Sequence, residues 1–418
     1  MSERPVTVCL YQAITQGGAH RTYSATRLDL AKSLVRNGIN DVATRVTGRM
    51  HLDRYHYLRG TRRSDESNKG DIGIGLAVRE QIEQALAPRA VEFVEVMWGN
   101  LDDKTIEQLN GTCDLFVIGG GGYIFVDGAG RLNERAVDLE LLGKIRVPII
   151  AYSIGLNRLL HEQENDLTAL PDQTQRTLQS FADTFALLSV RDGDTKMLFD
   201  RYTFGEVALT ADPALFLGRR HRKPLTRSKK FAVGINLAAH SWRAVHVLNA
   251  VLPSILPLLR KLARTPDLEL VYFVHHDLEL PVVALLKRNG IPLQVVDTDP
   301  VSMLDAYAQV DFVLCQMLHS AIFATNAGTP FLNIAYDLKS VAFAALLNTP
   351  EAAISYRLAS EGWLDHAFGA LFERRLSLRS QIEASKIELF RELQTFQSRI
   401  GDLIDTSAVT TAWSSQRR

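Results

Sequence analysis

The chain has 418 residues, 46% hydrophobic and 22% charged, which is enough apolar sequence for two or three globular domains. Lys plus Arg and Asp plus Glu number 47 each, so no overall charge attracts nucleic acid or an anionic membrane, and local cations must bind any anionic ligand. The first residues carry no secretory signal and no later stretch reaches the about 20 apolar residues of a membrane span, so we expect a soluble, cytoplasmic protein.

Short, continuously apolar runs alternate with longer amphipathic stretches along the chain. Runs without polar alternation are typical of a parallel sheet covered on both faces. The stretches between them predict helices, for example at 103–109, 173–186 and 251–263. We expect strands at 6–12, 92–98, 114–119, 147–155, 185–192, 206–216, 231–237, 268–276, 293–298, 311–316 and 330–336. This alternation predicts an α/β fold.

The alternation is interrupted at 218–230, a basic and polar segment that contains Pro224. We interpret this segment as a linker; the alternative, a polyphosphate or nucleic-acid patch, lacks interleaved aromatic residues. After Lys339 we expect no further strand, and 380–404 predicts a long amphipathic helix. The expected organisation is an N-terminal α/β domain (1–217), the linker (218–230), a C-terminal α/β domain (231–345) and a helical extension (346–418).

Two glycine-containing motifs are candidates for ligand binding. NKGDIGIG (68–75) places Asn68, Gly70 and Asp71 at a helix entrance, where backbone N–H groups suit a carboxylate or phosphate; the alternative is an ordinary N-cap. DLFVIGGGG (114–122) places four glycines at the carboxyl end of a strand, where open α/β sheets bind ligands. Ile124 stands where G-x-G-x-x-G requires glycine, so no dinucleotide fingerprint is present.

Charged residues follow three other predicted strands. Arg191 offers a planar fork of donors for a carboxylate or phosphate, although an ion pair with Asp192 or another carboxylate is an equal alternative. His319 opens a helix of small residues, and Lys339 follows the next strand. Because the carboxyl ends of parallel strands meet at one edge, we expect His319 and Lys339 to converge there.

The sequence gives no sign of an obligatory metal. DTD (297–299) resembles a metal-binding motif, but Asp299 followed by Pro300 predicts an N-cap. HHD (275–277) lacks the spacing and third ligand of a metal site. The three cysteines lack CxxC spacing and predict buried free thiols: Cys9, Cys113 and Cys315.

In order, these motifs resemble those of the polysaccharide pyruvyl transferase family. The resemblance covers roughly residues 60 to 345 and implies a GT-B-like fold, in which two Rossmann-like domains face a cleft that holds the active site. It is carried by NKGD (68–71), DLFVIGGGG (114–122), AYSIG (151–155), SVRDGDT (189–195), ADPA (211–214), MLHSAIFATNAGTP (317–330) and IAYDLK (334–339).

The resemblance implies transfer of pyruvate from phosphoenolpyruvate to two hydroxyls of a saccharide or lipid-linked glycan, forming a ketal. Protonation of the donor's methylene carbon makes its enol carbon electrophilic, which requires a proton carrier and cations but no redox cofactor. His319 suits the proton carrier, while Arg191 and Lys339 suit the donor's anionic groups. The resemblance implies the same three positions.

Other expected substrate contacts follow from the same motifs. Asn68, Gly70 and Asp71 would line the cleft from the N-terminal domain, towards the acceptor. We expect no nucleic-acid partner, and we leave a peripheral membrane association and a homo-oligomer open. The remaining expected substrate-binding residues are Gly120, Gly121, Gly155 and Asp337.

Two departures from the family pattern keep alternatives open. The family usually has arginine two residues before the histidine, where this chain has Met317, so one donor contact is either lost or supplied elsewhere, by Arg243 or Arg158. The segment 13–67 exceeds the family core and could shape the acceptor site. The alternatives are a GT-B glycosyltransferase that uses a nucleotide sugar, for which we find no clear acidic ribose-binding residue, and a catalytically lapsed member that binds a glycan or acts as a scaffold.

Overall fold

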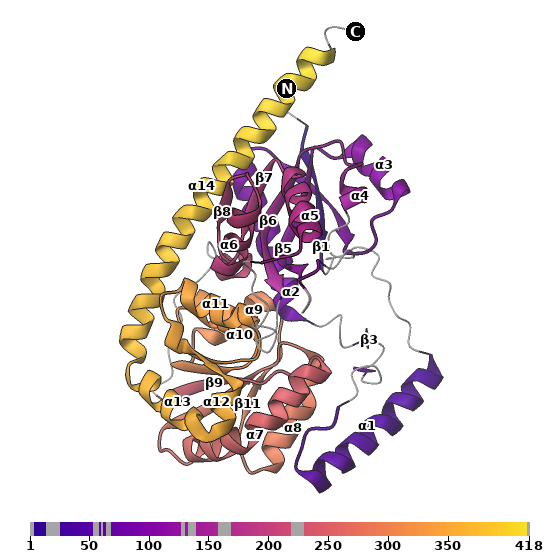
Figure 1. Cartoon of the computed structure of the whole chain (residues 1–418). Coiled ribbons are helices and arrows are strands. Elements are labelled where there is room, and N and C mark those ends of the chain that lie inside the picture. Colours follow the sequence, from indigo (N-terminus) through magenta and orange to yellow (C-terminus); the bar gives the residue numbers. More distant parts are fainter. Residues whose placement is uncertain are drawn as a thin grey trace. The chain divides into compact units, whose positions relative to one another are not determined.

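The computed structural model describes residues 4–13, 26–52, 58–59, 62–63, 68–126, 130–132, 139–157, 169–218 and 230–415 (Figure 1). The chain divides into two compact units. Unit 1 comprises Met1–Gly18, Ile74–Leu217 and Ser385–Arg418, and unit 2 comprises Ala19–Gly73 and Gly218–Ala384. Residues 19–73, expected in the first domain, therefore group with unit 2, and residues 385–418 group with unit 1. Most of the expected linker, 219–229, lies outside the described residues.

Unit 1 is built on a parallel six-stranded sheet of order β4-β1-β5-β6-β7-β8. Its central strands are buried almost throughout, which explains their continuous apolar sequence. Its strands are β1 (Val6–Gln12), β4 (Val91–Met97), β5 (Leu115–Phe125), β6 (Ile149–Asn157), β7 (Leu187–Val190) and β8 (Val207–Leu209). Its helices include α3 (Asp103–Thr112), α4 (Leu139–Leu142), α5 (Asp172–Asp183), α6 (Gly193–Tyr202) and the 3₁₀ turn η3 (Pro213–Phe216).

Unit 2 repeats this architecture with a second parallel sheet of order β11-β10-β9-β12-β13-β14. Its strands are β9 (Phe231–Asn236), β10 (Leu268–Phe273), β11 (Gln294–Val296), β12 (Phe312–Cys315), β13 (Phe331–Ala335) and β14 (Ala353–Ser355), and a separate antiparallel pair joins β2 (Leu58–Arg59) to β3 (Arg62–Arg63). Its helices include α1 (Arg27–Thr47), α7 (Trp242–Ala263), η4 (Asp277–Glu279), α8 (Leu280–Arg288), α9 (Pro300–Tyr307), α10 (Leu318–Asn326), α11 (Leu338–Leu346), η5 (Pro350–Ala352), α12 (Tyr356–Leu358), η6 (Ala359–Trp363) and α13 (Leu364–Glu373).

Two helices contain the boundaries between the units. α2 (Lys69–Leu86) begins in unit 2 and continues in unit 1, and α14 (Arg375–Ser415) contains the predicted helix at 380–404. In unit 1 the Phe396 ring of α14 lies edge-on against Tyr152, with centroids 5.6 Å apart, and Gln397 Nε2 donates to Gln81 O at 2.9 Å. The part of α14 around Phe396 and Gln397 is therefore a packed element of unit 1.

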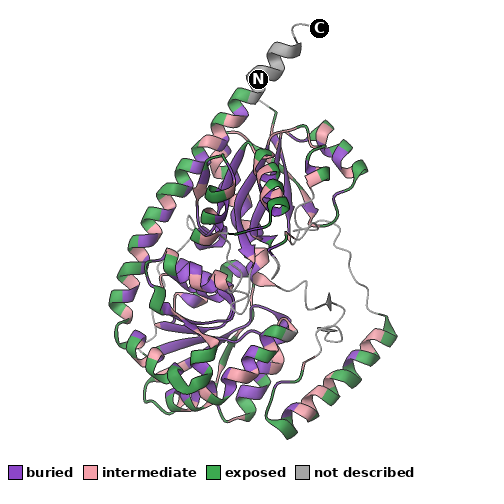
Figure 2. Ribbon diagram, in the orientation of Figure 1, coloured by how far each residue is buried: buried purple, intermediate pink, exposed green. Residues whose placement is uncertain are grey.

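The two helix-covered parallel sheets confirm the predicted α/β fold of two Rossmann-like domains with a helical C-terminal extension (Figures 1 and 2). The prediction that no strand follows Lys339 is wrong, because β14 pairs with β13 through Asn333 and Ala353. At three residues, β14 is too short to show a periodic pattern. Cys9, Cys113 and Cys315 are buried free thiols, as predicted.

Helix α7 is long and apolar enough to span a membrane by length and composition, contrary to the sequence-based expectation. It is the one such helix among the described residues. Its apolar side chains Val251, Ile255 and Leu259 are fully buried, and the helix packs against β10. These contacts assign α7 to the core of unit 2.

Candidate active site

The glycine run lies inside β5 rather than after it, since β5 continues to Phe125. Gly120 and Gly121 have φ angles of 45° and 85°, and the pairing with β6 shifts register between Gly121 and Ile124. A Cβ at Gly120 would lie 2.5 Å from Ile74 Cγ2, and one at Gly122 would lie 2.1 Å from Asn157 Nδ2. Gly120, Gly121 and Gly122 therefore form a bulge that favours residues without a side chain.

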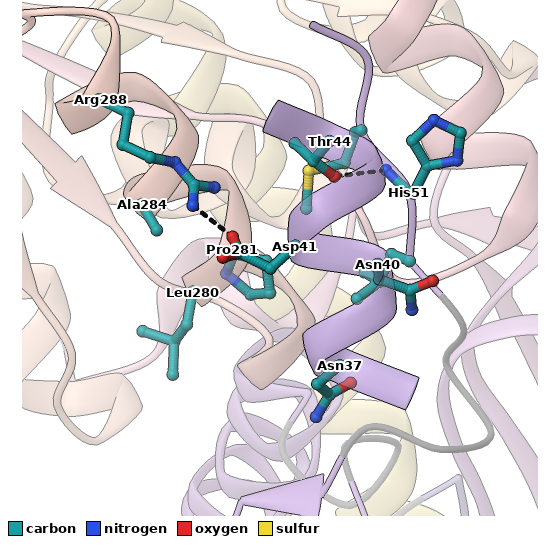
Figure 3. Close-up of a pocket in the computed structure, with 11 residues that line it drawn as sticks. Asn37, Asn40, Asp41, Thr44, His51, Leu280, Pro281, Ala284 and Arg288 are labelled. Atoms are coloured by element: carbon teal, nitrogen blue, oxygen red, sulfur yellow. Dashed lines mark hydrogen bonds and ion pairs between the residues drawn. The ribbon is translucent and has the colours of Figure 1, made fainter. Parts of the chain in front are cut away.

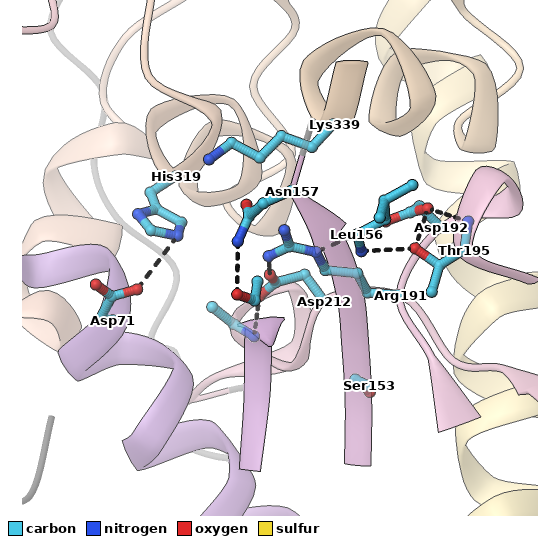
Figure 4. A network of polar contacts seen from close by, with 12 residues as sticks. Asp71, Ser153, Leu156, Asn157, Arg191, Asp192, Thr195, Asp212, His319 and Lys339 are labelled. Atoms are coloured by element: carbon cyan, nitrogen blue, oxygen red, sulfur yellow. Dashed lines mark hydrogen bonds and ion pairs between the residues drawn. The ribbon is translucent and has the colours of Figure 1, made fainter. Parts of the chain in front are cut away.

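Arg191 follows β7 in unit 1 and is buried, with 4% of its side chain exposed. Its guanidinium lies 3.2 Å from Asp212 Oδ2 and 3.7 Å from Asp192 Oδ2 (Figure 4). Burial raises the pKa of Asp212, while the Arg191 charge opposes this rise. The ion-pair alternative considered from the sequence is thus present, whereas a role of Arg191 in substrate binding stays a prediction.

Gly155 makes this arrangement of Arg191 sterically feasible. A Cβ at Gly155 would lie 2.2 Å from Arg191 Nε and 2.9 Å from Arg191 Cδ. The carboxylates are fixed by capping: Asp192 accepts from Thr195 N at 2.8 Å, and Asp212 accepts from Ala214 N at 3.1 Å. The motifs AYSIG, SVRDGDT and ADPA therefore meet around one buried cation.

Two strained residues in these motifs were not predicted. Ser153 and Ala211 have φ angles of 52° and 63°, in the left-handed region that favours glycine. Ser153 Oγ lies 2.7 Å from Thr210 Oγ1, and Ser153 N donates to Ser189 Oγ at 2.8 Å, which holds the strained backbone in place. Their only sequence signal was membership of the AYSIG and ADPA motifs, because side-chain type does not reveal a positive φ.

His319 lies in the first turn of α10 in unit 2, directly against the first turn of α2. A Cβ at Gly70 would lie 1.8 Å from His319 Nδ1, so glycine lets the imidazole rest on the helix backbone. Asp71 Oδ1 lies 3.8 Å from His319 Nε2 (Figure 4). Asn68 Nδ2 donates to Asp71 Oδ2 at 2.6 Å, and Asn68 Oδ1 accepts from Gly70 N at 3.1 Å. Asn68, Asp71 and His319 thus form a continuous polar array.

This array corrects the placement expected from the sequence. Asn68, Gly70 and Asp71 were expected on the domain opposite His319, but they belong to unit 2 and contact His319 directly. Residues 68–73 are far from 319 in the chain, and no local pattern reveals that the start of α2 packs on α10. A carboxylate beside an imidazole orients the ring.

Lys69, the second residue of NKGD, was overlooked in the sequence. Its ammonium donates to Val274 O at 2.7 Å and forms an ion pair with Asp297, and its backbone N donates to His275 O at 3.0 Å. Asp297 belongs to the DTD motif, whose Asp299 caps α9 as predicted. Lys69 therefore ties the start of α2, which carries Gly70 and Asp71, to the segments that follow β10 and β11.

Lys339 and Asp337 follow β13 in unit 2. Asp337 caps α11 by accepting from Ser340 N at 3.1 Å, and its other oxygen lies 3.4 Å from Lys339 Nζ. α10 and α11 pack against each other, and Figure 4 shows the ammonium end of Lys339 turned toward His319. The expected convergence of His319 and Lys339 at one sheet edge is confirmed.

Met317, where the family usually has arginine, is a core residue. It is 4% exposed and packs in an apolar cluster with Ala238, Ala244, Val247 and Tyr336. An arginine in this cluster would bury a charge among apolar side chains. Arg243 is exposed in the first turn of α7, and Arg158 lies outside the described residues.

A buried polar network underlies the edge that carries His319. His275 Nε2 lies 2.8 Å from Tyr307 OH, which lies 2.6 Å from Ser320 Oγ. Glu279 Oε2 accepts from His275 N and from Asn236 Nδ2, both at 2.9 Å. Burial lowers the pKa of His275 to about 3 and raises the pKa of Glu279 to about 8, so both groups are neutral near pH 7. The HHD motif (275–277) is thus part of the core. The sequence did not show this burial, because three polar residues after an apolar strand look the same whether they are buried or exposed.

Among the described residues, no group of three or more His, Cys, Asp or Glu side chains is placed to hold a metal ion. At the edge that carries His319, the structure places an imidazole, its carboxylate partner Asp71 and the ammonium group of Lys339.

Comparisons with solved structures find similarity at low identity. A UDP-N-acetylglucosamine 2-epimerase from Neisseria meningitidis is 13% identical, with 77% of this chain and 97% of that chain covered and a TM-score of 0.47. MnaA from S. aureus, solved with UDP, is 13% identical over 75% and 88% of the two chains, with a TM-score of 0.48. An α,α-trehalose 6-phosphate synthase from Burkholderia multivorans is 13% identical over 100% and 99%, with a TM-score of 0.44.

The sequence comparisons differ in what they find. None of the curated proteins compared with the chain matches it. The family model described as polysaccharide pyruvyl transferase matches residues 36–337, which include Arg191, His319 and every motif quoted for the resemblance except the end of IAYDLK (334–339); Lys339 lies two residues beyond the match. The chain therefore belongs to the polysaccharide pyruvyl transferase family.

Proposed function

We propose that this protein transfers pyruvate from phosphoenolpyruvate to two hydroxyls of a saccharide or glycolipid precursor and so forms a pyruvate ketal. The contact of His319 with Gly70 and Asp71 carries this proposal, because it supplies an oriented proton carrier in a member of the family. Lys339 supplies a cation at the same edge of unit 2 for an anionic donor.

The proposed reaction assigns each proton and bond. Protonated His319 gives its proton to the methylene carbon of phosphoenolpyruvate, and the enol carbon becomes electrophilic. One sugar hydroxyl adds to that carbon and returns its proton to His319. The carbon–oxygen bond to phosphate breaks, the second hydroxyl adds, and its proton leaves with inorganic phosphate. Asp71 stabilises the imidazolium before the first transfer, and Asn68 holds Asp71 in position.

The role proposed for Arg191 follows from its position in unit 1 and from the ion pairs that its charge makes. Its guanidinium forms ion pairs with Asp212 and Asp192. We therefore propose that Arg191 holds the AYSIG and ADPA segments of unit 1 in position, and that it does not bind the donor's anionic groups. We do not assign Arg191 the direct contact with phosphoenolpyruvate that the resemblance implies.

The test incubates the full chain with phosphoenolpyruvate and a panel of glycosides, and follows phosphate release together with the ketal methyl resonance. His319→Ala should abolish both signals, and Asp71→Asn should lower the rate roughly 10- to 100-fold. His246→Ala, at an exposed position of α7, is the matched control and should keep the wild-type rate. Wild-type activity that survives His319→Ala would show that another group moves the proton.

A thermal-shift series separates this proposal from the nucleotide-sugar alternative. Phosphoenolpyruvate should stabilise the wild-type chain, and uridine or guanosine diphosphate should not. Stabilisation by the nucleotides alone would refute the pyruvyl donor. Stabilisation by glycosides without phosphate release would instead favour the lapsed, glycan-binding alternative.

A further inference from the structure

Helix α1 turns its apolar stripe away from the rest of unit 2. Six of its apolar residues are between 54% and 81% exposed; Leu34 lies apart from the other five, which are Leu28, Val35, Ile39, Val42 and Val46. At about 100° per residue these five fall within a sector roughly 60° wide, so they form one continuous stripe along the 21-residue helix. Figure 2 shows α1 as largely exposed.

The polar face of α1 makes the contacts with unit 2. Ser33 and Thr44 are the buried residues of the helix. Asn37, Asn40, Asp41 and Thr44 line a pocket of about 290 Å³ with residues of α8 (Figure 3). Asp41 forms an ion pair with Arg288 of that helix. The orientation is thus the reverse of the usual one, in which an amphipathic helix buries its apolar face.

The chain beyond α1 is also anchored to unit 2. Met50 N donates to Asn249 Oδ1 at 2.6 Å, and Asn249 Nδ2 donates to Met50 O at 2.9 Å. Together with the Asp41 ion pair, this pairing fixes which face of α1 meets the protein. The exposed stripe is therefore a consequence of specific polar contacts.

Basic residues border the stripe on both sides. At about 100° per residue, Lys32 and Arg36 lie along one edge, and Arg27 and Arg45 lie along the other. All four are exposed, and Arg49 follows just after the helix. The acidic residues of the helix are engaged: Asp29 accepts from the N-cap residue Thr26, and Asp41 pairs with Arg288 and Arg45. The solvent-facing side of α1 is therefore apolar at its centre and cationic at its margins.

We propose that α1 lies in the plane of an anionic membrane surface and binds it through this stripe. Apolar residues that enter the acyl boundary between flanking cations that reach the headgroups are the pattern of interfacial helices. A second copy of the chain would bring the same cations together around a shared stripe, which opposes self-association. The overall charge of zero means that the attraction is local to α1. This inference is independent of the proposed reaction.

Flotation of the full chain with vesicles tests the inference. We expect binding to vesicles containing about a third phosphatidylserine, weak binding to pure phosphatidylcholine, and release as salt rises from about 0.1 to 0.5 M. Val35→Ser with Val42→Ser should lower the partition coefficient at least about tenfold, because each apolar group lost from the acyl boundary weakens binding several-fold. Arg27→Gln with Lys32→Gln should lower it by a similar factor on anionic vesicles only.

The matched control removes equally accessible apolar side chains from unit 1. Met197→Ser with Phe204→Ser, at residues 48% and 98% exposed, should leave flotation unchanged. Absence of flotation in the wild type, or flotation that the stripe variant retains, would overturn the inference. So would wild-type self-association in sedimentation velocity that the stripe variant abolishes while vesicle binding is absent, because the stripe would then join two copies.

Discussion

Gly70→Ala is the most specific perturbation of the candidate site. The added Cβ would lie 1.8 Å from His319 Nδ1, 2.0 Å from Cγ and 2.6 Å from Cβ. Ordinary contact begins at 3.4 Å, so the ring must move by about 3.4 − 1.8 = 1.6 Å. All three of these atoms belong to the His319 side chain, so that side chain would have to move. The movement changes its position relative to Asp71.

The magnitudes for stability and activity are very different. Alanine favours a helix over glycine by about 1 kcal/mol, and overpacking costs about 1–3 kcal/mol, so the net change in unfolding free energy should be within about 2 kcal/mol. A displacement of about 1 Å in a reacting group can cost about a hundredfold in rate. We therefore expect kcat to fall about a hundredfold while the thermal midpoint moves only a few degrees.

Two assays check this prediction. Phosphate release from phosphoenolpyruvate in the presence of an active glycoside measures the rate. The ¹⁵N NMR resonances of the His319 imidazole report a change in the ring's surroundings, and they can be recorded without an acceptor. Gly369→Ala in α13 is the matched control, because in the described part of the chain its Cβ would meet no atom within 4 Å. That control should leave both the rate and the His319 resonance unchanged.

Two outcomes would refute the reasoning. If the His319 resonance shifts in Gly70→Ala while the full rate persists, His319 is not the proton carrier. If neither the resonance nor the rate changes, the imidazole does not rest on Gly70.

Three further predictions concern the cores that support the site. Gly155→Ala should destabilise unit 1 by about 2–4 kcal/mol in urea unfolding, because its Cβ would lie 2.2 Å from Arg191 Nε, whereas Gly193→Ala should have little effect; equal stability of the two variants would contradict this packing. Folded Glu279 holds its proton to about pH 8 and unfolded Glu279 only to about 4.5, whereas His275 is neutral when folded and takes up a proton below about pH 6.5 when unfolded, so the two effects oppose each other below pH 6.5. Stability should therefore fall as pH rises from about 6.5 to about 8, by up to about 1.4 kcal/mol per unit; Glu279→Gln should remove that slope, and an unchanged slope would exclude Glu279 as its source. Met317→Arg should cost about 3 kcal/mol or more of unfolding free energy and Met317→Leu less than about 1.5 kcal/mol, so a fully stable arginine variant would show that the cluster admits a charge.

Local sequence patterns were sufficient for most of the architecture. Continuous apolar runs predicted the buried parallel strands, and Asp299 before Pro300 predicted the cap of α9. The pattern failed at β14, where three residues carry no period, and at β5, where the glycines bend the strand without ending it. A strand can contain a glycine bulge only when neighbouring strands and side chains hold it, and those neighbours are distant in sequence.

The sequence identified the residues of the candidate site, but it did not show which of them contact one another. Arg191, His319 and Lys339 were identified from their positions after strands. The carboxylates around Arg191 were left as one of two alternatives, and Lys69 was overlooked because a lysine at a helix start resembles any surface lysine. Burial and contacts with Val274 and Asp297 distinguish it, and neither is visible locally.

The sequence by itself determined the α/β alternation, the ends of most strands and the family motifs, because periodicity, caps and turn residues act within a few positions of the chain. Only the tertiary structure decided that Asp71 and Gly70 meet His319, that Met317 belongs to an apolar cluster, and that α1 faces the protein with its polar side. These features depend on which distant segments pack together, and packing follows from the path of the whole chain rather than from any one stretch.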